Sequence, residues 1–145
     1  MSTVAQILRA KRGKAVHSIG PQSTVYEVVK AMAEHGIGAL LVVEGERIVG
    51  IVTERDYARK IVLAGRTSKE TPVADIMTRD VLFVSPQQTT EECMALMTEN
   101  RVRHLPVLDK GQLVGLVSIG DLVKDIISEQ RFIIEQLEHY ITGSR

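Results

Sequence analysis

Short runs of aliphatic and β-branched residues mark two hairpins along the chain. The first joins Ala39–Val43 to Ile48–Val52, and the second joins Leu105–Leu108 to Leu113–Val117. A short polar turn that contains a glycine separates the two runs of each pair. Dense β-branched runs on either side of a glycine turn are typical of antiparallel hairpins. The pattern therefore predicts two small sheets.

Helical patterns precede and follow each hairpin. Thr24 and Thr89 are each followed three positions later by a glutamate, and then by apolar residues at helical spacing. This is the capping-box arrangement that satisfies free N–H groups where a helix begins. A further helix is expected to begin near Thr53 in the first case and near Ser118 in the second. The last helix continues over Gly120–Tyr140.

The two sets of elements are copies of each other. Shifting the sequence by 65 positions lays Pro21–Val62 over Pro86–Ile127 without a gap. An extended run opens each copy, Val16–Ile19 in the first and Val81–Val84 in the second. The order within a copy is strand, helix, strand, strand, helix, which predicts an α/β fold. One copy of about 50 residues buries too little surface alone, so the two copies are expected to pack their sheets together.

The repeat divides the chain into five segments. The segment between the copies contains Gly65, Ser68 and Pro72 and is expected to be a surface linker. The tail beyond the repeat carries an apolar helical stripe, which either covers the protein's own surface or forms a homodimer contact. The expected segments are an N-terminal helix or arm (1–13), the first repeat (14–65), the linker (66–77), the second repeat (78–128) and the C-terminal helix extension (129–145).

Composition and charge narrow the classes of function. Basic and acidic residues number 18 each, and aromatic residues make up 3% of the chain. A neutral chain with few aromatic rings is a poor candidate for binding nucleic acid or a membrane surface. The single cysteine, Cys93, lies in an apolar helical pattern and is expected in the core. No apolar run is long enough to span a membrane and no signal-peptide core is present, so the cytoplasm is predicted.

The motif with the clearest chemistry also occurs twice. An apolar strand leads into a hydroxyl residue, Thr53 or Ser118, and an aspartate follows three positions later, Asp56 or Asp121. One interpretation is structural: the two side chains cap the helix. The other is ligand binding, because a helix N-terminus attracts phosphate and a carboxylate there can accept hydrogen bonds from a ribose diol. Duplication at the same place in both copies favours ligand binding.

These motifs resemble those of a tandem pair of CBS domains, also called a Bateman module. The runs Arg103–Val107 and Asp75–Thr78 match as well, and the likeness covers about residues 14–128. The whole chain is similar to stand-alone bacterial proteins with two CBS domains. The resemblance implies two repeats related by a pseudo-twofold axis, two clefts between paired sheets, and a homodimer.

The resemblance also implies a ligand and its contacts. The ligand would be an adenine nucleotide, AMP, ADP, ATP or NAD, held as a regulatory ligand rather than as a catalytic cofactor. Asp56 and Asp121 would hold ribose hydroxyls, while Thr53, Ser118 and Arg55 would contact phosphate or ribose oxygens. The adenine slot would be formed by Val16, His17, Ile37 and Ala39 in the first copy, and by Val81, Leu82, Arg103 and Leu105 in the second. Gly38 and His104 would be further nucleotide-binding residues.

The two clefts are expected to differ. Arg103 and His104 stand where the first copy has Gly38 and Ala39, and basic side chains there would reach a phosphate. Unequal affinities or unequal ligands follow. The basic cluster of the N-terminal arm, Arg9, Lys11, Arg12 and Lys14, is interpreted as a solvated face rather than as a phosphate contact.

The sequence thus predicts a nucleotide sensor that changes shape and is read by an unidentified partner protein. One alternative is a protein-interaction module with vestigial clefts, and another is a regulator that binds S-adenosylmethionine. An enzyme is not expected, because no set of nucleophile, base and orienting residue can be assembled. The four histidines do not have the spacing of metal ligands, so no metal site is expected.

Overall fold

The computed structural model describes residues 2–11 and 16–142, and these fall into two compact units. The first-copy unit is Ala15–Val81, and the second-copy unit combines Met1–Lys14 with Leu82–Arg145. The compact units therefore do not follow the order of the chain. The N-terminal segment belongs to the second copy, although the first copy follows it in the sequence.

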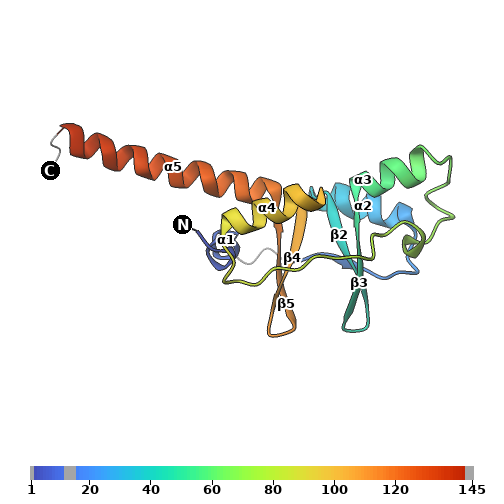
Figure 1. The fold of residues 1–145 in the computed structure, drawn as a ribbon. Coiled ribbons are helices and arrows are strands. Elements are labelled where there is room, and N and C mark those ends of the chain that lie inside the picture. The colour runs from blue at the N-terminus through green and yellow to red at the C-terminus, as the bar shows by residue number, and fades with distance from the viewer. Residues whose placement is uncertain (1, 12–15, 143–145) are drawn as a thin grey trace. The chain divides into compact units, whose positions relative to one another are not determined.

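The first-copy unit places helices against one face of a three-stranded sheet in the order β1-β2-β3 (Figure 1). Strand β1 pairs with β2 in parallel, and β2 pairs with β3 in antiparallel fashion, with a bulge between Val42 and Val43. The strands are β1 (Ser18–Ile19), β2 (Ala39–Glu44) and β3 (Arg47–Thr53), and the helices are α2 (Val25–His35) and α3 (Glu54–Tyr57), a π-helix (Ala58–Val62) and a 3₁₀-helix (Val73–Asp75).

The second-copy unit repeats this plan with a two-stranded sheet. Strands β4 and β5 form an antiparallel pair with a bulge after Val107. Its elements are α1 (Val4–Ala10), α4 (Thr90–Asn100), β4 (His104–Asp109), β5 (Gln112–Ser118) and α5 (Ile119–Thr142). The two hairpins and the capping boxes at Thr24 and Thr89 are confirmed.

The strand expected at Val81–Val84 is wrong in extent, because only Val84 forms a parallel bridge, to Val107. The reason lies in β4. In the first copy the N–H of Leu41 donates to the carbonyl of His17 at 3.2 Å. The residue that corresponds to Leu41 in the repeat is Pro106, which has no N–H to donate. The ladder therefore shrinks to a single bridge.

Each copy is completed by the segment that precedes the other copy in the chain. The segment before the first copy packs on the second copy, and the segment before the second copy packs on the first. In the second-copy unit, Val4 N–H donates to Gln88 O at 2.8 Å and Ala5 N–H to Pro86 O at 2.9 Å. In the first-copy unit, Val73 and Ala74 make the corresponding bonds to Ser23 O and Pro21 O at 2.8 and 2.9 Å.

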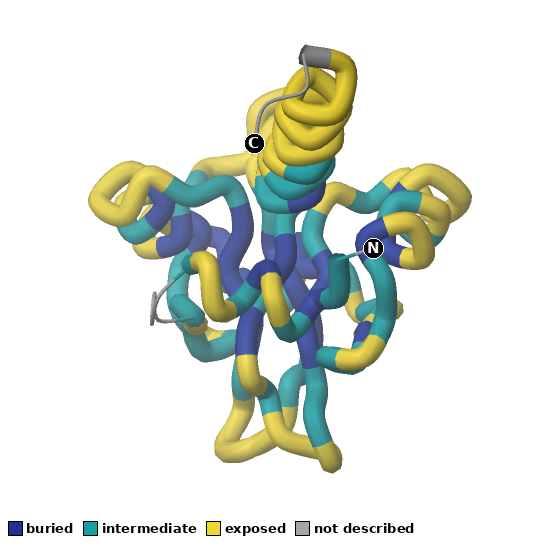
Figure 2. Tube along the Cα trace, turned by 90° about the vertical axis from the view of Figure 1, so that its left-hand side faces the viewer, coloured by how far each residue is buried: buried dark blue, intermediate teal, exposed yellow. Residues whose placement is uncertain are grey.

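The segment expected to be a surface linker is therefore part of the core over its second half. Thr71 is buried, and so are Val73, Ile76 and Met77, which pack among the residues of β2, β3 and α2. Figure 2 shows the buried residues gathered around the strands, whereas the hairpin tips are exposed. The first-copy core is Val25, Val28, Met32, Leu40, Val42, Val52, Ile61, Val73, Ile76 and Met77; the second-copy core is Val4, Ile7, Val84, Cys93, Met97, Leu105, Val107, Val117 and Leu122.

Candidate functional site

The duplicated motif forms a helix cap in both copies. Thr53 keeps an extended backbone at the end of β3, and its hydroxyl accepts from the Asp56 N–H at 3.2 Å. The Asp56 carboxylate in turn accepts from the Thr53 N–H at 3.0 Å. Ser118 and Asp121 make the same two bonds at 3.1 and 2.9 Å, between β5 and α5. The capping interpretation of both pairs is confirmed, and it fixes the two carboxylates where a strand turns into a helix.

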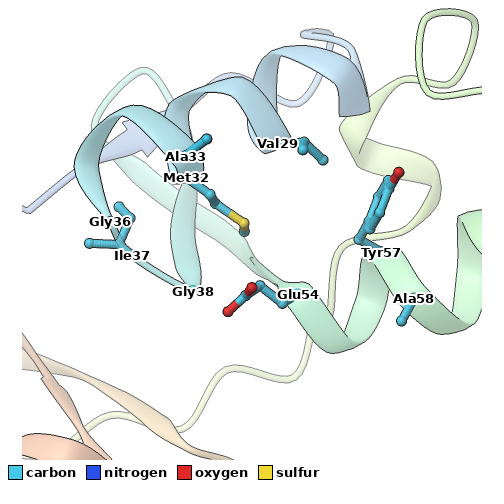
Figure 3. A pocket seen from close by; sticks show the side chains of 9 residues that line it. All are labelled: Val29, Met32, Ala33, Gly36, Ile37, Gly38, Glu54, Tyr57 and Ala58. Carbon is cyan, nitrogen blue, oxygen red and sulfur yellow. The ribbon is translucent and has the colours of Figure 1, made fainter.

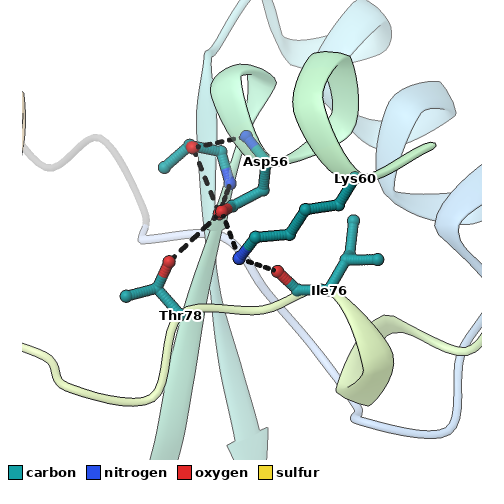
Figure 4. A network of polar contacts seen from close by, with 5 residues as sticks. Asp56, Lys60, Ile76 and Thr78 are labelled. Atoms are coloured by element: carbon teal, nitrogen blue, oxygen red, sulfur yellow. Dashed lines mark hydrogen bonds and ion pairs between the residues drawn. The ribbon is translucent and has the colours of Figure 1, made fainter. Parts of the chain in front are cut away.

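In the first copy, Asp56 is the centre of a polar network (Figure 4). The Lys60 ammonium lies 3.0 Å from Asp56 Oδ1 and also donates to the carbonyl of Ile76 at 2.9 Å. The Thr78 hydroxyl donates to Asp56 Oδ1 at 3.2 Å. Lys60 comes from the π-helix, one turn beyond Asp56, while Ile76 and Thr78 come from the segment before the second copy. The network therefore ties that segment to the helix cap.

In the second copy, the N-terminal arm supplies the cation. The Lys11 ammonium lies 2.9 Å from Asp121 Oδ2 and donates to the Leu116 carbonyl at 2.8 Å. Burial opposes ionisation of this carboxyl, but the hydrogen bonds from the Ser118 N–H and from Lys11 outweigh it. They hold the pKa of Asp121 below its ordinary value.

The repeat explains why the lysine beside Asp121 comes from a different part of the chain than the lysine beside Asp56. The position that corresponds to Lys60 is occupied by Asp125, whose carboxylate accepts from the Thr90 hydroxyl at 3.1 Å. A cation for Asp121 must therefore come from elsewhere, and Lys11 provides it. The side chain of Asp121 is 22% exposed, compared with 9% for Asp56. The second carboxylate is thus the more accessible of the two.

Two of the expected nucleotide-binding residues of the first copy, Gly38 and Ala39, lie close to the cap. Ala39 pairs with Thr53 across the hairpin, and the Gly38 carbonyl accepts from the Glu54 N–H at 3.1 Å. His17 lies at the edge of β2, and its ring stacks on that of His35 with centroids 3.8 Å apart. This contact at the end of α2 is not apparent from the sequence. Val16 and Arg55 are partly exposed.

The expected nucleotide-binding residues of the second copy are divided among different environments. His104 pairs with Ser118, and the Arg103 carbonyl accepts from the Ile119 N–H at 2.9 Å, so both residues lie beside the cap. Leu105, by contrast, is fully buried in the second-copy core, and Leu82 is a partly buried residue that packs against that core. Val81 belongs to the first-copy unit.

His104 is electrostatically coupled to the carboxylate. Burial lowers the pKa of His104 below its ordinary value, and the positive charges of Lys11 and Arg103 lower it further, against the opposing effect of Asp121. The histidine is therefore neutral at pH 7. The second copy gathers two cations, a neutral imidazole and a carboxylate, a set of side chains suited to phosphate and hydroxyl groups.

A cavity of about 660 Å³ lies in the first-copy unit, but on the helical side of the sheet (Figure 3). Of the expected nucleotide-binding residues, Ile37 and Gly38 line it. The carboxylate at its mouth is Glu54, not Asp56, and Tyr57 projects into it from α3. The remaining lining residues are Val29, Met32, Ala33, Gly36 and Ala58. The cavity is therefore distinct from the cap that holds Asp56.

Sequence reasoning missed the roles of Lys60, Thr78 and Lys11. A signal was present: Val4–Leu8 and Val73–Met77 share the pattern Val-Ala-x-Ile followed by Leu or Met. The copies align at a shift of 65 positions, but these segments align at a shift of 69, so an alignment without gaps does not detect them.

The interpretation of the basic arm as a solvated face is wrong for Lys11, whose ammonium pairs with Asp121. Arg9 is exposed, and Arg12 and Lys14 lie outside the described residues.

Neither a metal-binding cluster nor a membrane-spanning helix occurs in the described part of the chain. Within residues 2–11 and 16–142, no group of three or more His, Cys, Asp or Glu side chains is arranged to hold a metal ion. No helix in the same part of the chain is both long and apolar enough to cross a bilayer. Cys93 is confirmed as a buried core residue, and burial raises the pKa of its thiol.

Comparison with known proteins identifies the class that this fold and these caps define. The family model of the CBS domain matches the chain twice, over residues 4–63 and 73–128. The chain therefore belongs to the CBS-domain family and contains a pair of such domains. The matches begin at residues 4 and 73, so each of them includes the segment that precedes one copy and completes the other.

Individual relatives cover most of the chain. The mitochondrial CBS domain-containing protein CBSX3 of Arabidopsis thaliana is 41% identical over 98% of this chain and 73% of its own length. The structure of a protein with CBS domains from Burkholderia ambifaria MC40-6 is 60% identical, with a TM-score of 0.86 over 89% of this chain and 96% of that one. A hexameric CBS-CP12 protein from bloom-forming cyanobacteria is 28% identical, with a TM-score of 0.74 over 85% of this chain and 70% of that one.

Proposed function

We propose that this CBS-domain pair is a regulatory module that binds an adenosyl ligand, AMP, ADP, ATP or NAD, at Asp56 and Asp121 and transmits the binding as a change of shape. The observation that carries the proposal is the duplicated strand end. In both units a hydroxyl and an aspartate three residues later cap the start of a helix, and a lysine ammonium lies 3.0 Å from the carboxylate in the first copy and 2.9 Å in the second. A cation suits phosphate, and a fixed carboxylate suits a ribose diol.

Ligand binding must compete with the contacts that the carboxylates already make. Asp56 is bonded to Thr53, Lys60 and Thr78, whereas the bonds that the structure assigns to Asp121 among the described residues converge on Oδ2. Asp121 is also the more exposed, with Arg103 and His104 beside it. The second copy is therefore expected to bind an adenosyl ligand more tightly than the first.

Competition also links the ligand to the N-terminal arm. A ribose whose hydroxyls donate to the Asp121 carboxylate displaces or redirects Lys11, which directly follows α1. In the first copy the equivalent displacement affects Lys60 and Thr78. A ligand changes the shape of a protein only through its difference in affinity for the two shapes. The lysine contacts are a physical source of that difference.

The test is a thermal-shift and calorimetric titration with AMP, ATP, NAD and S-adenosylmethionine. The wild-type protein is compared with Asp56→Ala and Asp121→Ala, and with the surface-carboxylate controls Asp75→Ala and Asp109→Ala. Hydrogen bonds to a charged group contribute roughly 1.5–3 kcal/mol, so each site variant should weaken one binding event about 10- to 100-fold. Asp121→Ala should remove the tighter event, and the controls should keep both.

The same titration addresses the alternatives. Both carboxylates are satisfied within the protein, which is the observation that favours an interaction module with vestigial clefts. If no adenosyl compound binds at millimolar concentration, the proposal is wrong and that alternative stands. Binding of S-adenosylmethionine alone would assign the ligand to that compound. Binding that neither aspartate variant alters would remove the two carboxylates from the site.

A further inference from the structure

The C-terminal helix α5 carries an apolar surface that its own unit does not cover. The helix has 24 residues and is roughly 36 Å long. Leu122 at its start belongs to the second-copy core, and Asp125 bonds to Thr90 of α4. From Gln130 to Ile141 every residue is exposed, and Figures 1 and 2 show this part extending beyond α1 and α4. Within its own unit, this half of the helix therefore does not cover the protein's surface.

The exposed apolar residues follow a heptad pattern. Spacings of four and three alternate along one stripe, in which Gln130 is the polar position, and this alternation is the signature of a helix that packs against another helix. Large side chains on the stripe are about half exposed or more, for example Ile134 at 53% and Leu137 at 55%. The stripe consists of Ile127, Ile134 and Ile141 at the a positions and Val123, Gln130 and Leu137 at the d positions.

The flanks of this stripe indicate which helix it fits. On one side, the g positions are apolar: Ile126, Ile133 and Tyr140. On the other side, the e positions are charged: Lys124, Arg131 and Glu138. A parallel copy of the helix would place each apolar flank against a charged one. An antiparallel copy places apolar against apolar, and charged against charged.

The antiparallel arrangement also matches the charges along the flank. With Ile127 layered on the partner's Leu137, Lys124 lies opposite the partner's Glu138, and the symmetric pair forms at the other end. Ile126 then meets the partner's Tyr140. Arg131 meets the partner's Arg131 at the centre, so the attraction comes from the two outer pairs and from the apolar layers.

We infer that α5 is an interface for a second copy of this chain, paired through its stripe in antiparallel orientation. The surface is separate from Asp56 and Asp121, so the inference does not rest on the proposed ligand. Pairing through a helix that grows directly out of the Ser118–Asp121 cap joins the two second-copy units of a dimer. The helix on which Asp121 lies would then be continuous with the contact between the copies.

The first test measures solution mass by light scattering for the full chain. Leu137→Glu places a charge in the stripe, and its matched control, Gln136→Glu, places the same charge one residue earlier and off the stripe. Leu137→Glu is expected to reduce the mass at least twofold at micromolar concentration, and Gln136→Glu to leave it unchanged. Circular dichroism confirms that both variants are folded. An unchanged mass for folded Leu137→Glu overturns the inference.

The second test determines the orientation by disulfide trapping. Cys93 is buried, so an introduced cysteine on α5 is the accessible thiol. Ile127→Cys and Leu137→Cys are oxidised separately and as a mixture in which one variant carries a mass tag. The antiparallel layers predict a cross-link between the two variants only in the mixture. Cross-linking of either variant with itself shows a parallel pair and overturns the inference, as does the absence of any cross-link.

Discussion

The two copies of the repeat solve the same local problem with different parts. Each places an aspartate in a helix cap and sets a lysine ammonium beside it. In the first copy Lys60 comes from the same helical segment as Asp56, and in the second Lys11 comes from an arm 110 positions away in the chain. The first carboxylate is consequently more enclosed and the second more accessible. A duplicated motif therefore does not guarantee a duplicated environment.

The largest expected effect concerns the two segments that precede the copies, Val4–Leu8 and Val73–Met77. Ile7 and Ile76 occupy corresponding places in the second-copy and first-copy cores, and both are buried. Either Ile→Ala change should reduce the free energy of unfolding by about 2–5 kcal/mol. Hydrogen exchange should locate the loss in β4 and β5 for Ile7→Ala, and in β2 and β3 for Ile76→Ala. Val62→Ala, at an exposed position, serves as the control.

The opposite result for Ile7 would contradict the division into units. If Ile7→Ala accelerated exchange mainly in β2 and β3, the arm would stabilise the copy that follows it in the sequence. The bonds from Val4 and Ala5 to the second copy would then have no energetic weight.

The glycines of the two motifs should respond unequally to a methyl group. A Cβ at Gly50 would lie 2.8 Å from the backbone carbonyl of Thr78, which accepts from the Ile51 N–H. At Gly115 the three nearest atoms would all belong to the side chain of Leu8. Overpacking against a fixed backbone costs about 1–3 kcal/mol, and a side chain can move. Urea unfolding should therefore show a larger loss for Gly50→Ala than for Gly115→Ala. Equal losses would show that Leu8 is as rigid as the backbone.

The smallest expected effect is a pH dependence of the free energy of unfolding. It arises in the second copy only, because the first copy has Ala39 at the position of His104. Because the folded protein lowers the pKa of His104 below 6.5, the unfolded chain binds more protons between the two values. The free energy of unfolding should fall as the pH decreases below about 6.5. His104→Gln should make this decline shallower, whereas His139→Gln, on the exposed part of α5, should not. Denaturant titrations at pH 7.5 and 5.5 measure the difference.

Much of the fold is predictable because its signals are local. The hairpins depend on β-branched runs with a glycine between them, and the helix starts depend on capping boxes at Thr24 and Thr89. The carboxylates were found for the same reason, since each lies three residues after its hydroxyl partner. The strand at Val81–Val84 failed because Pro106, more than twenty residues later, withholds the necessary N–H.

The hairpins, the caps and the positions of Asp56 and Asp121 follow from residues a few positions apart, and the repeat follows from aligning the chain with itself, so the sequence alone is enough for all of them. Only the tertiary structure decided that Val4–Ala10 completes the second copy and that Lys11 and Lys60 neutralise the two carboxylates. It also decided that the second-copy unit leaves the second half of its own helix α5 uncovered. These outcomes depend on how segments that are distant in the chain pack against each other. The pattern of a single segment does not contain that information.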